Sequence, residues 1–332
     1  MISVIIPIYN NGGTIKHCLD CIVPALGQQD EVIIVDDGSQ DNGKAICQAY
    51  AEQFSIIKII SQNNQGPSVA RNKGIEMARE PYIMFFDGDD KIDTALFASF
   101  VAFMRAEEQK YSDVDVWLND FVMQTQNGLV CDSLQSGLHM NEQIIGMKAL
   151  YTYLSGRGTY ANVWRCVFRR DFLVKNNIRF KDDIRCGEDL VFMTQCFSVG
   201  KQFLFYCMPF YYYIVEQGES LSHNRSLQSV MDFFAAFDAS YTYIQQDEVG
   251  NCLKKKLLRE MIMILPRLSD LSEEKRLLGE EAFMSHMPLL KESPTITHRM
   301  IYIWICLFGI SGTSRLFAAL RRWRRRLKGL SK

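Results

Sequence analysis

The first 90 residues alternate four times between a short apolar run and a helical pattern, and this alternation constrains the fold more than any other feature. The apolar runs lie at residues 2–8, 31–35, 56–60 and 82–86. Continuous apolar runs are typical of strands that are buried on both faces of a parallel sheet. We therefore predict an α/β fold, with a doubly wound, mostly parallel sheet and helices on both of its faces.

Beyond residue 90 the pattern loosens and predicts a mixture of helices and strands. We expect helices at 93–108, 141–154 and 187–199, strands at 114–118, 163–168, 203–206 and 210–215, and a polar hairpin at 124–138. From residue 227 the pattern is helical and rich in Met and Leu. We place a boundary near residue 222, which predicts an α/β domain at 1–222 and an α-helical C-terminal region at 223–332.

The fourth apolar run ends in the acidic turn Asp87-Gly88-Asp89-Asp90. Carboxylates at the end of a buried strand repel each other and resist desolvation, so a positive charge must offset their cost. Carboxylate oxygens suit a hard divalent cation, and a D-x-D pair leaves coordination positions open for phosphate oxygens. The turn therefore predicts metal and phosphate binding. The alternative is a helix N-cap beside a solvated turn.

A second acidic turn, Asp36-Asp37-Gly38, follows the second apolar run. In a doubly wound sheet the carboxyl ends of the strands line one crevice, where ligands bind. Asp37 can accept hydrogen bonds from a base or a ribose, and the end of the first run adds Pro7, Tyr9 and Asn10. We expect a nucleotide here. An Asx-turn with Gly38 in the left-handed region is the alternative.

Neither a GxGxxG after the first run nor a GxxxxGK[ST] occurs in the sequence, which argues against a dinucleotide oxidoreductase and a P-loop NTPase. The ten cysteines show no zinc-type spacing, and reduced thiols in a cytosolic compartment fit them best.

Five motifs occur in order: ISVIIPIYN, VDDGS, NQGPSVARNKGIEMA, YIMFFDGDD and GEDLVF. Over residues 1 to about 215 this set resembles glycosyltransferase family 2, the inverting enzymes of GT-A fold that use nucleotide sugars. The resemblance implies a nucleotide-diphosphate-sugar donor, usually a UDP-sugar, and a saccharide acceptor. It implies a manganese or magnesium ion on Asp87 and Asp89. His223 is a weaker candidate ligand.

The resemblance also implies roles for further residues. The residues expected at the donor nucleotide are Pro7, Tyr9, Asn10, Asp37, Gly66, Arg71, Asp87 and Gly88. Glu188 and Asp189 form the expected catalytic pair, with Asp189 as general base. The segment around Trp164 corresponds to the acceptor side, where this ring would stack on a sugar.

Each of these roles has a structural alternative. Glu188 and Asp189 stand at a predicted helix N-terminus, which keeps carboxylates ionised, but simple capping would explain them too. Arg71 contacts diphosphate or is an exposed helix residue, Trp164 is a sugar platform or a core residue, and His223 is a ligand or a surface residue. At the level of function, the alternatives are a catalytically inactive, membrane-bound partner protein and a sugar nucleotidyltransferase.

The C-terminal tail, residues 295–332, combines an apolar segment at 300–310 with a basic end. Residues 315–332 carry eight Arg or Lys and no acidic residue; subtracting these from the chain's total of -1 leaves -9 for the rest. Eleven apolar residues, followed by the polar residues 311–314, are too short to span a bilayer, so we expect an in-plane helix on an anionic membrane surface. The alternative is a buried helix with a solvated charged end. We expect no nucleic-acid partner, because no recognition module accompanies the arginines.

These features together predict a transferase in the cytoplasm, peripherally attached to the inner face of the cell membrane. The resemblance to the family, and not the residues themselves, implies that its acceptor would be a lipid-linked oligosaccharide in bacterial surface polysaccharide synthesis.

Overall fold

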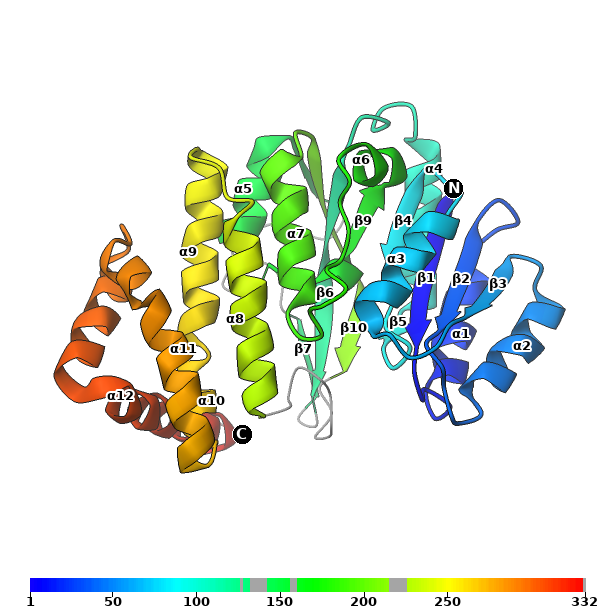
Figure 1. Cartoon of the computed structure of the whole chain (residues 1–332). Helices are drawn as coiled ribbons and strands as arrows, with labels where there is room; N and C mark the ends of the chain where they lie inside the picture. The colour runs from blue at the N-terminus through cyan, green and yellow to red at the C-terminus, as the bar shows by residue number, and fades with distance from the viewer. Residues whose placement is uncertain (126–127, 132–141, 156–159, 215–225, 331–332) are drawn as a thin grey trace. The chain divides into compact units, whose positions relative to one another are not determined.

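The computed structural model describes the chain except for residues 126–127, 132–141, 156–159, 215–225 and 331–332. The chain divides into two compact units, Met1–Gln217 and Gly218–Lys332 (Figure 1). The boundary predicted near residue 222 and the candidate ligand His223 lie outside the described residues, as do most of the predicted hairpin's residues.

The first unit is built on one large mixed sheet. Its strands are β1 (Ile2–Ile8), β2 (Glu31–Asp36), β3 (Ile57–Ser61), β4 (Tyr82–Phe85), β5 (Lys91–Ile92), β6 (Val116–Thr125), β7 (Gly128–Cys131), β8 (Gln143–Ile145), β9 (Cys166–Arg169) and β10 (Phe203–Ile214). The strand order is β3-β2-β1-β4-β9-β6-β10-β5, with β7 on β6 and β8 on β10. The strands β1 to β4 are parallel, as the sequence predicts, and β10 is parallel to β6. β9 is antiparallel to both of its neighbours.

Helices cover both faces of this sheet. The helices of the first unit are α1 (Ile15–Ile22), η1 (Val23–Ala25), α2 (Gly43–Gln53), α3 (Pro67–Met77), α4 (Thr94–Ala106), α5 (Met147–Ser155), η2 (Val163–Arg165), α6 (Arg170–Lys175) and α7 (Glu188–Val199). Alternate residues of β1, such as Ile2 and Val4, join α1 and α4 in one core cluster. Ile5 points to the other face and packs against Gly74 of α3, where even a Cβ would collide. Burial on both faces explains why β1 is apolar throughout.

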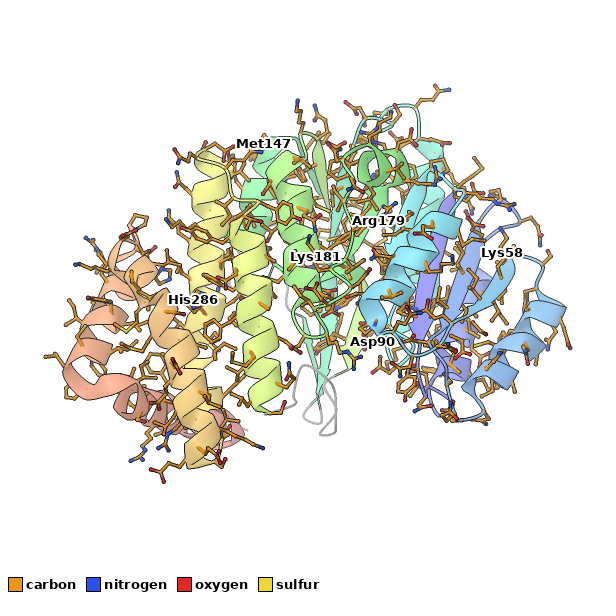
Figure 2. The ribbon with its side chains drawn as sticks, in the orientation of Figure 1. Lys58, Asp90, Met147, Arg179, Lys181 and His286 are labelled. Carbon is orange, nitrogen blue, oxygen red and sulfur yellow. The ribbon has the colours of Figure 1, made fainter. Side chains whose placement is uncertain are left out.

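The second unit consists of helices in the part that the structure describes. They are α8 (Leu227–Tyr241), α9 (Glu248–Ile262), α10 (Leu265–Leu268), α11 (Glu273–Lys291) and α12 (Ile296–Leu330). His286 lies on α11 (Figure 2). Its ring stacks on Phe234 of α8, and its Nε2 lies 2.8 Å from Asp238, which is also on α8. The predicted α-helical C-terminal region is therefore present.

Three predicted elements differ from the structure. The helix predicted at 141–154 is partly wrong, because β8 occupies 143–145 and Gly146, with φ 72°, ends the strand before α5. The two strands predicted at 203–206 and 210–215 are one strand, β10, whose register with β6 shifts between Tyr206 and Tyr211. The strand predicted at 163–168 begins only at Cys166, because residues 163–165 form the 3-10 helix η2. α12 is helical on both sides of Gly309 (φ 69°, ψ 168°), where its backbone leaves the helical conformation.

Candidate functional site

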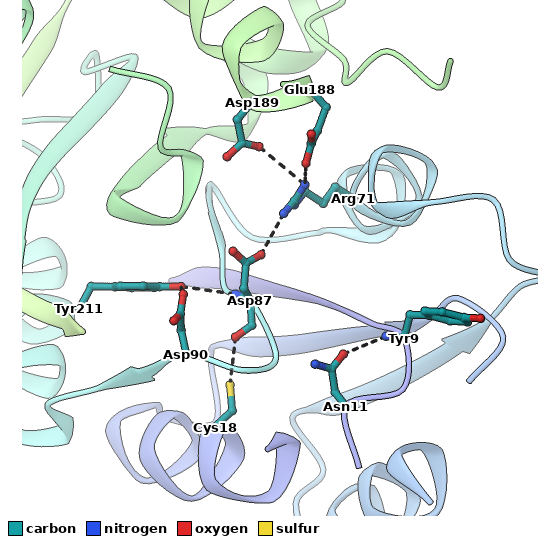
Figure 3. A network of polar contacts seen from close by, with 9 residues as sticks. All are labelled: Tyr9, Asn11, Cys18, Arg71, Asp87, Asp90, Glu188, Asp189 and Tyr211. Carbon is teal, nitrogen blue, oxygen red and sulfur yellow. Dashed lines mark hydrogen bonds and ion pairs between the residues drawn. The ribbon is translucent and has the colours of Figure 1, made fainter. Parts of the chain in front are cut away.

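The acidic turn that follows β4 is fixed from two sides, by Thr14 and by Tyr211; Figure 3 shows the Tyr211 side. The Thr14 hydroxyl, at the start of α1, donates to the Gly88 carbonyl at 2.9 Å. From β10, the Tyr211 hydroxyl donates to Asp90 Oδ2 at 2.9 Å. A Cβ at Gly88 would lie 3.3 Å from side-chain atoms of Asn11 and Ile8, so a larger residue would require these neighbours to shift by a few tenths of an ångström. Asp90 is buried, and its carboxylate secures the turn to β10.

Asp37, after β2, holds the loop that leads into α3. Its Oδ1 accepts hydrogen bonds from the Gln65 N–H at 2.8 Å and the Gln62 side-chain amide at 2.9 Å. Its Oδ2 accepts from the Gly66 N–H at 2.8 Å. Gly66 has φ 94°, a conformation that favours glycine. Asp37 is 4% exposed, and both of its carboxylate oxygens bond to the loop around Gly66. It therefore influences the predicted nucleotide side of the crevice by fixing the position of this loop.

The end of β1 presents an exposed aromatic ring. Tyr9 is 48% exposed, and its N–H donates to Asn11 Oδ1 at 2.9 Å. Asn10 has φ 57° and connects to the β2 end, because its Oδ1 accepts from the Gln40 N–H at 2.8 Å and its N–H donates to Ser39 Oγ at 3.1 Å. Pro7 is half-buried beside them. The structure thus brings Tyr9 and Asn10 to the same edge of the sheet as Asp37.

A polar, open pocket of about 490 Å³ lies beside this edge, at the carboxyl ends of β2 and β3. Its lining residues are Asp36, Gly38, Ser39, Gln40, Lys44, Ser61, Gln62 and Asn63. Neither Asp87 nor Asp189 belongs to the lining, so this pocket adjoins the predicted nucleotide side rather than the acidic turn.

Arg71 of α3 joins the acidic turn to the start of α7 (Figure 3). Its Nη2 lies 2.9 Å from Asp87 Oδ1, and its Nη1 lies 2.9 Å from Glu188 Oε1 and 3.6 Å from Asp189 Oδ1. The side chain is 6% exposed, so the alternative of an exposed helix arginine is wrong. One guanidinium therefore contacts three carboxylates from two segments that lie far apart in the sequence.

Within this cluster, the Asp189 carboxyl has a strongly raised pKa. Gly187, with φ 89°, caps α7 and places Glu188 and Asp189 in its first turn. Burial raises the pKa of the Asp189 carboxyl to about 8; the Arg71 guanidinium opposes this rise, and the charges of Glu188 and Asp87 add to it. Among the described residues, its Oδ1 has no hydrogen-bond partner. The Asp189 side chain is 19% exposed, and a half-buried carboxyl with a pKa near neutrality is suited to accept a proton.

The net charge of this cluster indicates whether a divalent cation would be stabilised beside it. With all groups ionised, Asp87, Glu188 and Asp189 against Arg71 leave a net charge of -2, and Asp89 lies close to Asp87 in the sequence. Within the described part of the chain, no three His, Cys, Asp or Glu side chains converge to hold an ion by themselves. The oxygen donors at Asp87 and Asp89 therefore fit a hard cation that takes its other ligands from phosphate and water.

Two aromatic residues, Trp164 and Tyr211, pack against each other. Trp164 of η2 is 4% exposed; it stacks on Tyr211 and Tyr213 and meets Phe121 edge-on, which favours the core alternative over a sugar platform. Tyr211, which the sequence reasoning did not select, contacts both Trp164 and the acidic turn. The sequence feature that could have identified Tyr211 is its place in the Tyr-rich run of β10.

Comparison with known proteins agrees with the motif pattern. Residues 3–121 match the model of glycosyl transferase family 2. This part of the chain belongs to that family. The family 2 domain thus contains the strands β1 to β4, Arg71 and the acidic turn, and the recognition made from the motifs is confirmed.

Two curated relatives match a longer stretch. The uncharacterized glycosyltransferase YibD of Escherichia coli is 32% identical over 195 residues, which is 58% of this chain and 55% of that protein. The cholesterol galactosyltransferase of Borreliella burgdorferi is 30% identical over 220 residues, 63% of this chain and 59% of that protein. The chain therefore spans somewhat more than half the length of these relatives.

Among solved structures, residues 1–349 of S. aureus TarS in complex with UDP-GlcNAc match with a TM-score of 0.74 and 19% identity, covering 97% of this chain and 91% of that one. This likeness concerns the fold. The predicted fold class, a GT-A-like α/β sheet followed by a helical region, is confirmed.

Proposed function

We propose that the chain is an inverting glycosyltransferase that moves a sugar from a UDP-sugar to an acceptor hydroxyl. One observation carries the proposal: Arg71 brings the acidic turn at Asp87 and the half-buried carboxyl of Asp189 into one cluster. Metal–phosphate chemistry and a proton acceptor are the two parts that such a transfer needs. The UDP-GlcNAc complex of TarS, which has the same fold, supports the choice of nucleotide.

In this proposal the donor nucleotide lies at the edge formed by β1 and β2. Tyr9 offers its exposed ring to the uracil face, and Asn10, Pro7 and the loop fastened by Asp37 and Gly66 surround it. Aromatic stacking on a base contributes about 1–3 kcal/mol. Gly88 lets the diphosphate approach the backbone closely. Arg71 adds a positive charge nearby while its own contacts are to carboxylates.

The proposed chemical step needs no covalent enzyme intermediate. Asp189 takes the proton from the acceptor hydroxyl as that oxygen attacks the anomeric carbon. The bond between this carbon and the diphosphate oxygen breaks, and its electron pair leaves with the UDP. Because attack comes from the side opposite the leaving group, the anomeric configuration inverts. A manganese or magnesium ion held by Asp87 and Asp89 would stabilise the charge on the departing diphosphate.

The acceptor in this proposal is a saccharide, and a lipid-linked oligosaccharide fits a transferase of the cytoplasmic membrane face. The relative from Borreliella burgdorferi, a cholesterol galactosyltransferase by name, supports a lipid-borne hydroxyl as the acceptor. This setting is an inference from relatives, and the transfer reaction can be tested without it.

The test is release of UDP from a panel of UDP-sugars, with and without Mn²⁺, by the wild type and by Asp189→Asn. General base catalysis is worth about 10²–10⁴ in rate, so we expect the variant to lose activity by that factor while it still binds UDP. Asp171→Asn, which alters an exposed carboxylate of α6, is the matched control and should keep full activity. Equal rates in wild type and Asp189→Asn would contradict the assignment of the base.

A further inference from the structure

The first half of α12 carries an exposed apolar stripe. Its members are Ile296, Met300, Ile303, Trp304, Leu307 and Phe308, and they are between 41% and 69% exposed. Their spacing of three and four residues places them on one side of the helix. The opposite side faces the second unit's core, since Ile305 is 3% exposed and His298 is 7% exposed. This segment, residues 296–308, is called the docking helix below.

The docking helix differs from the core helix of a soluble protein. The most apolar 18-residue window of residues 296–320 has a mean hydropathy of 1.6, yet only 28% of it is buried in the structure. Six large apolar side chains on one face form a contiguous patch of the kind that marks a protein or membrane interaction site. The stripe therefore needs a partner.

A membrane-spanning arrangement does not fit the rest of α12. The helix breaks at Gly309, so the docking helix is only ~20 Å long, against ~30 Å for a bilayer's hydrocarbon core. After the break, the hydroxyls of Ser311 and Ser314 donate to Glu280 and to the Leu265 carbonyl. Ser314 is fully buried. These bonds attach the second half of α12 to α10 and α11.

The charge pattern selects the partner. Arg299 on the docking helix and Arg315 after the break are exposed, and seven more Arg or Lys follow to the end of the chain without an acidic residue. A second copy of this chain would bring two such basic ends together, which repel each other. An anionic lipid surface complements them, because basic side chains near such a surface are attracted to its phosphates.

We propose that the docking helix lies in the plane of an anionic membrane, with its apolar stripe inserted among the lipids and the following basic residues on their phosphates. The Trp304 ring, with its polar N–H, suits the boundary between headgroups and acyl chains. This inference goes beyond the transfer reaction, because it concerns the second unit and holds whether or not the first unit is an active transferase.

The test uses the full chain and sedimentation with vesicles of phosphatidylcholine alone or with phosphatidylcholine and phosphatidylglycerol in a ratio of about two to one. We expect binding only to the anionic vesicles and at least ten-fold weaker binding by the double variant Leu307→Glu/Phe308→Glu. The matched control is Val174→Glu/Met77→Glu, which alters two exposed apolar residues of the first unit and should bind as the wild type does. Circular dichroism and UDP affinity should be the same in all three proteins, which separates this test from that of the transfer reaction.

Four outcomes would overturn the proposal. The double variant could bind as tightly as the wild type, or the wild type could bind both vesicles equally. Alternatively, light scattering could show a dimer that the double variant disrupts, without vesicle binding, which would assign the stripe to a second copy of the chain. Retention in the bilayer after alkaline carbonate would favour a spanning helix and would also contradict the in-plane arrangement.

Discussion

At the scale of single residues, the site depends on an imbalance of charge around Arg71. One guanidinium contacts Asp87, Glu188 and Asp189, and the Asp189 carboxyl is left with a pKa raised to about 8 by burial. A carboxyl with this pKa is protonated at low pH and becomes a base as the pH rises. In the donor-free enzyme, kcat/KM should therefore decline as the pH falls below about 8.

Glu188→Gln tests this account through the position of that decline. The charge of Glu188 raises the pKa of Asp189. Glu188 also pairs with Arg71, whose own charge lowers the pKa of Asp189. Neutralising Glu188 removes a like charge and frees Arg71 for Asp189, so both effects lower the pKa. We expect the acidic limb of the kcat/KM profile to move to lower pH by on the order of one unit. A limb that stays in place or moves upward would show that Asp189 does not control it; Asp171→Asn should leave it unchanged.

The sequence predicted some of these residues and missed the contacts between them. Asp87 and Asp189 stand out because each follows a strong local pattern, an apolar strand in one case and a helix start in the other. The role of Arg71 as a link was not predicted, because its partner Glu188 is 117 residues away and only the folded sheet brings them together. Trp164 shows a different limit, because the sequence alone does not distinguish an aromatic side chain that packs in the core from one that binds a ligand.

At the scale of elements, β10 does more than extend the sheet. Its Tyr211 reaches the acidic turn after β4, and its ring stacks on Phe86 with the centroids 5.2 Å apart. The sequence predicted strands on both sides of residue 208 but not this contact, because strand order in a mixed sheet is decided by long-range pairing. The four parallel strands β1 to β4 were predictable, since their alternation with helices is local.

Tyr211→Phe measures the contribution of β10 to the turn. The change keeps the ring and removes the hydroxyl that donates to the buried Asp90. Loss of one partner of a buried hydrogen bond costs about 1–3 kcal/mol, so the free energy of unfolding in urea should fall by that amount. Tyr241→Phe, at a half-buried tyrosine of α8, is the control for removing a hydroxyl elsewhere. A Tyr211→Phe protein as stable as the wild type would mean that the turn is held by other contacts.

At the scale of the whole molecule, the two units differ in composition. The first unit contains the acidic cluster and the family 2 domain, while the second unit contains the apolar docking helix and the basic end. The change to a helical, Met- and Leu-rich pattern from residue 227 predicted the two units, and the distribution of charge predicted only that the basic end differs from the rest. The position of the break in α12 was not predictable, because the serines that follow Gly309 act through contacts with α10 and α11.

The most direct test of the central claim is calorimetric titration of UDP into the full chain, with and without Mn²⁺, for wild type and Asp89→Ala. Asp89 is the better choice because Asp87 also holds Arg71. We predict that UDP binds tightly only with Mn²⁺ and at least ten-fold more weakly to Asp89→Ala, while Asp171→Ala binds as the wild type does. UDP binding that is independent of both Mn²⁺ and Asp89, or no binding of UDP, GDP or dTDP, would contradict a metal-dependent nucleotide-sugar site.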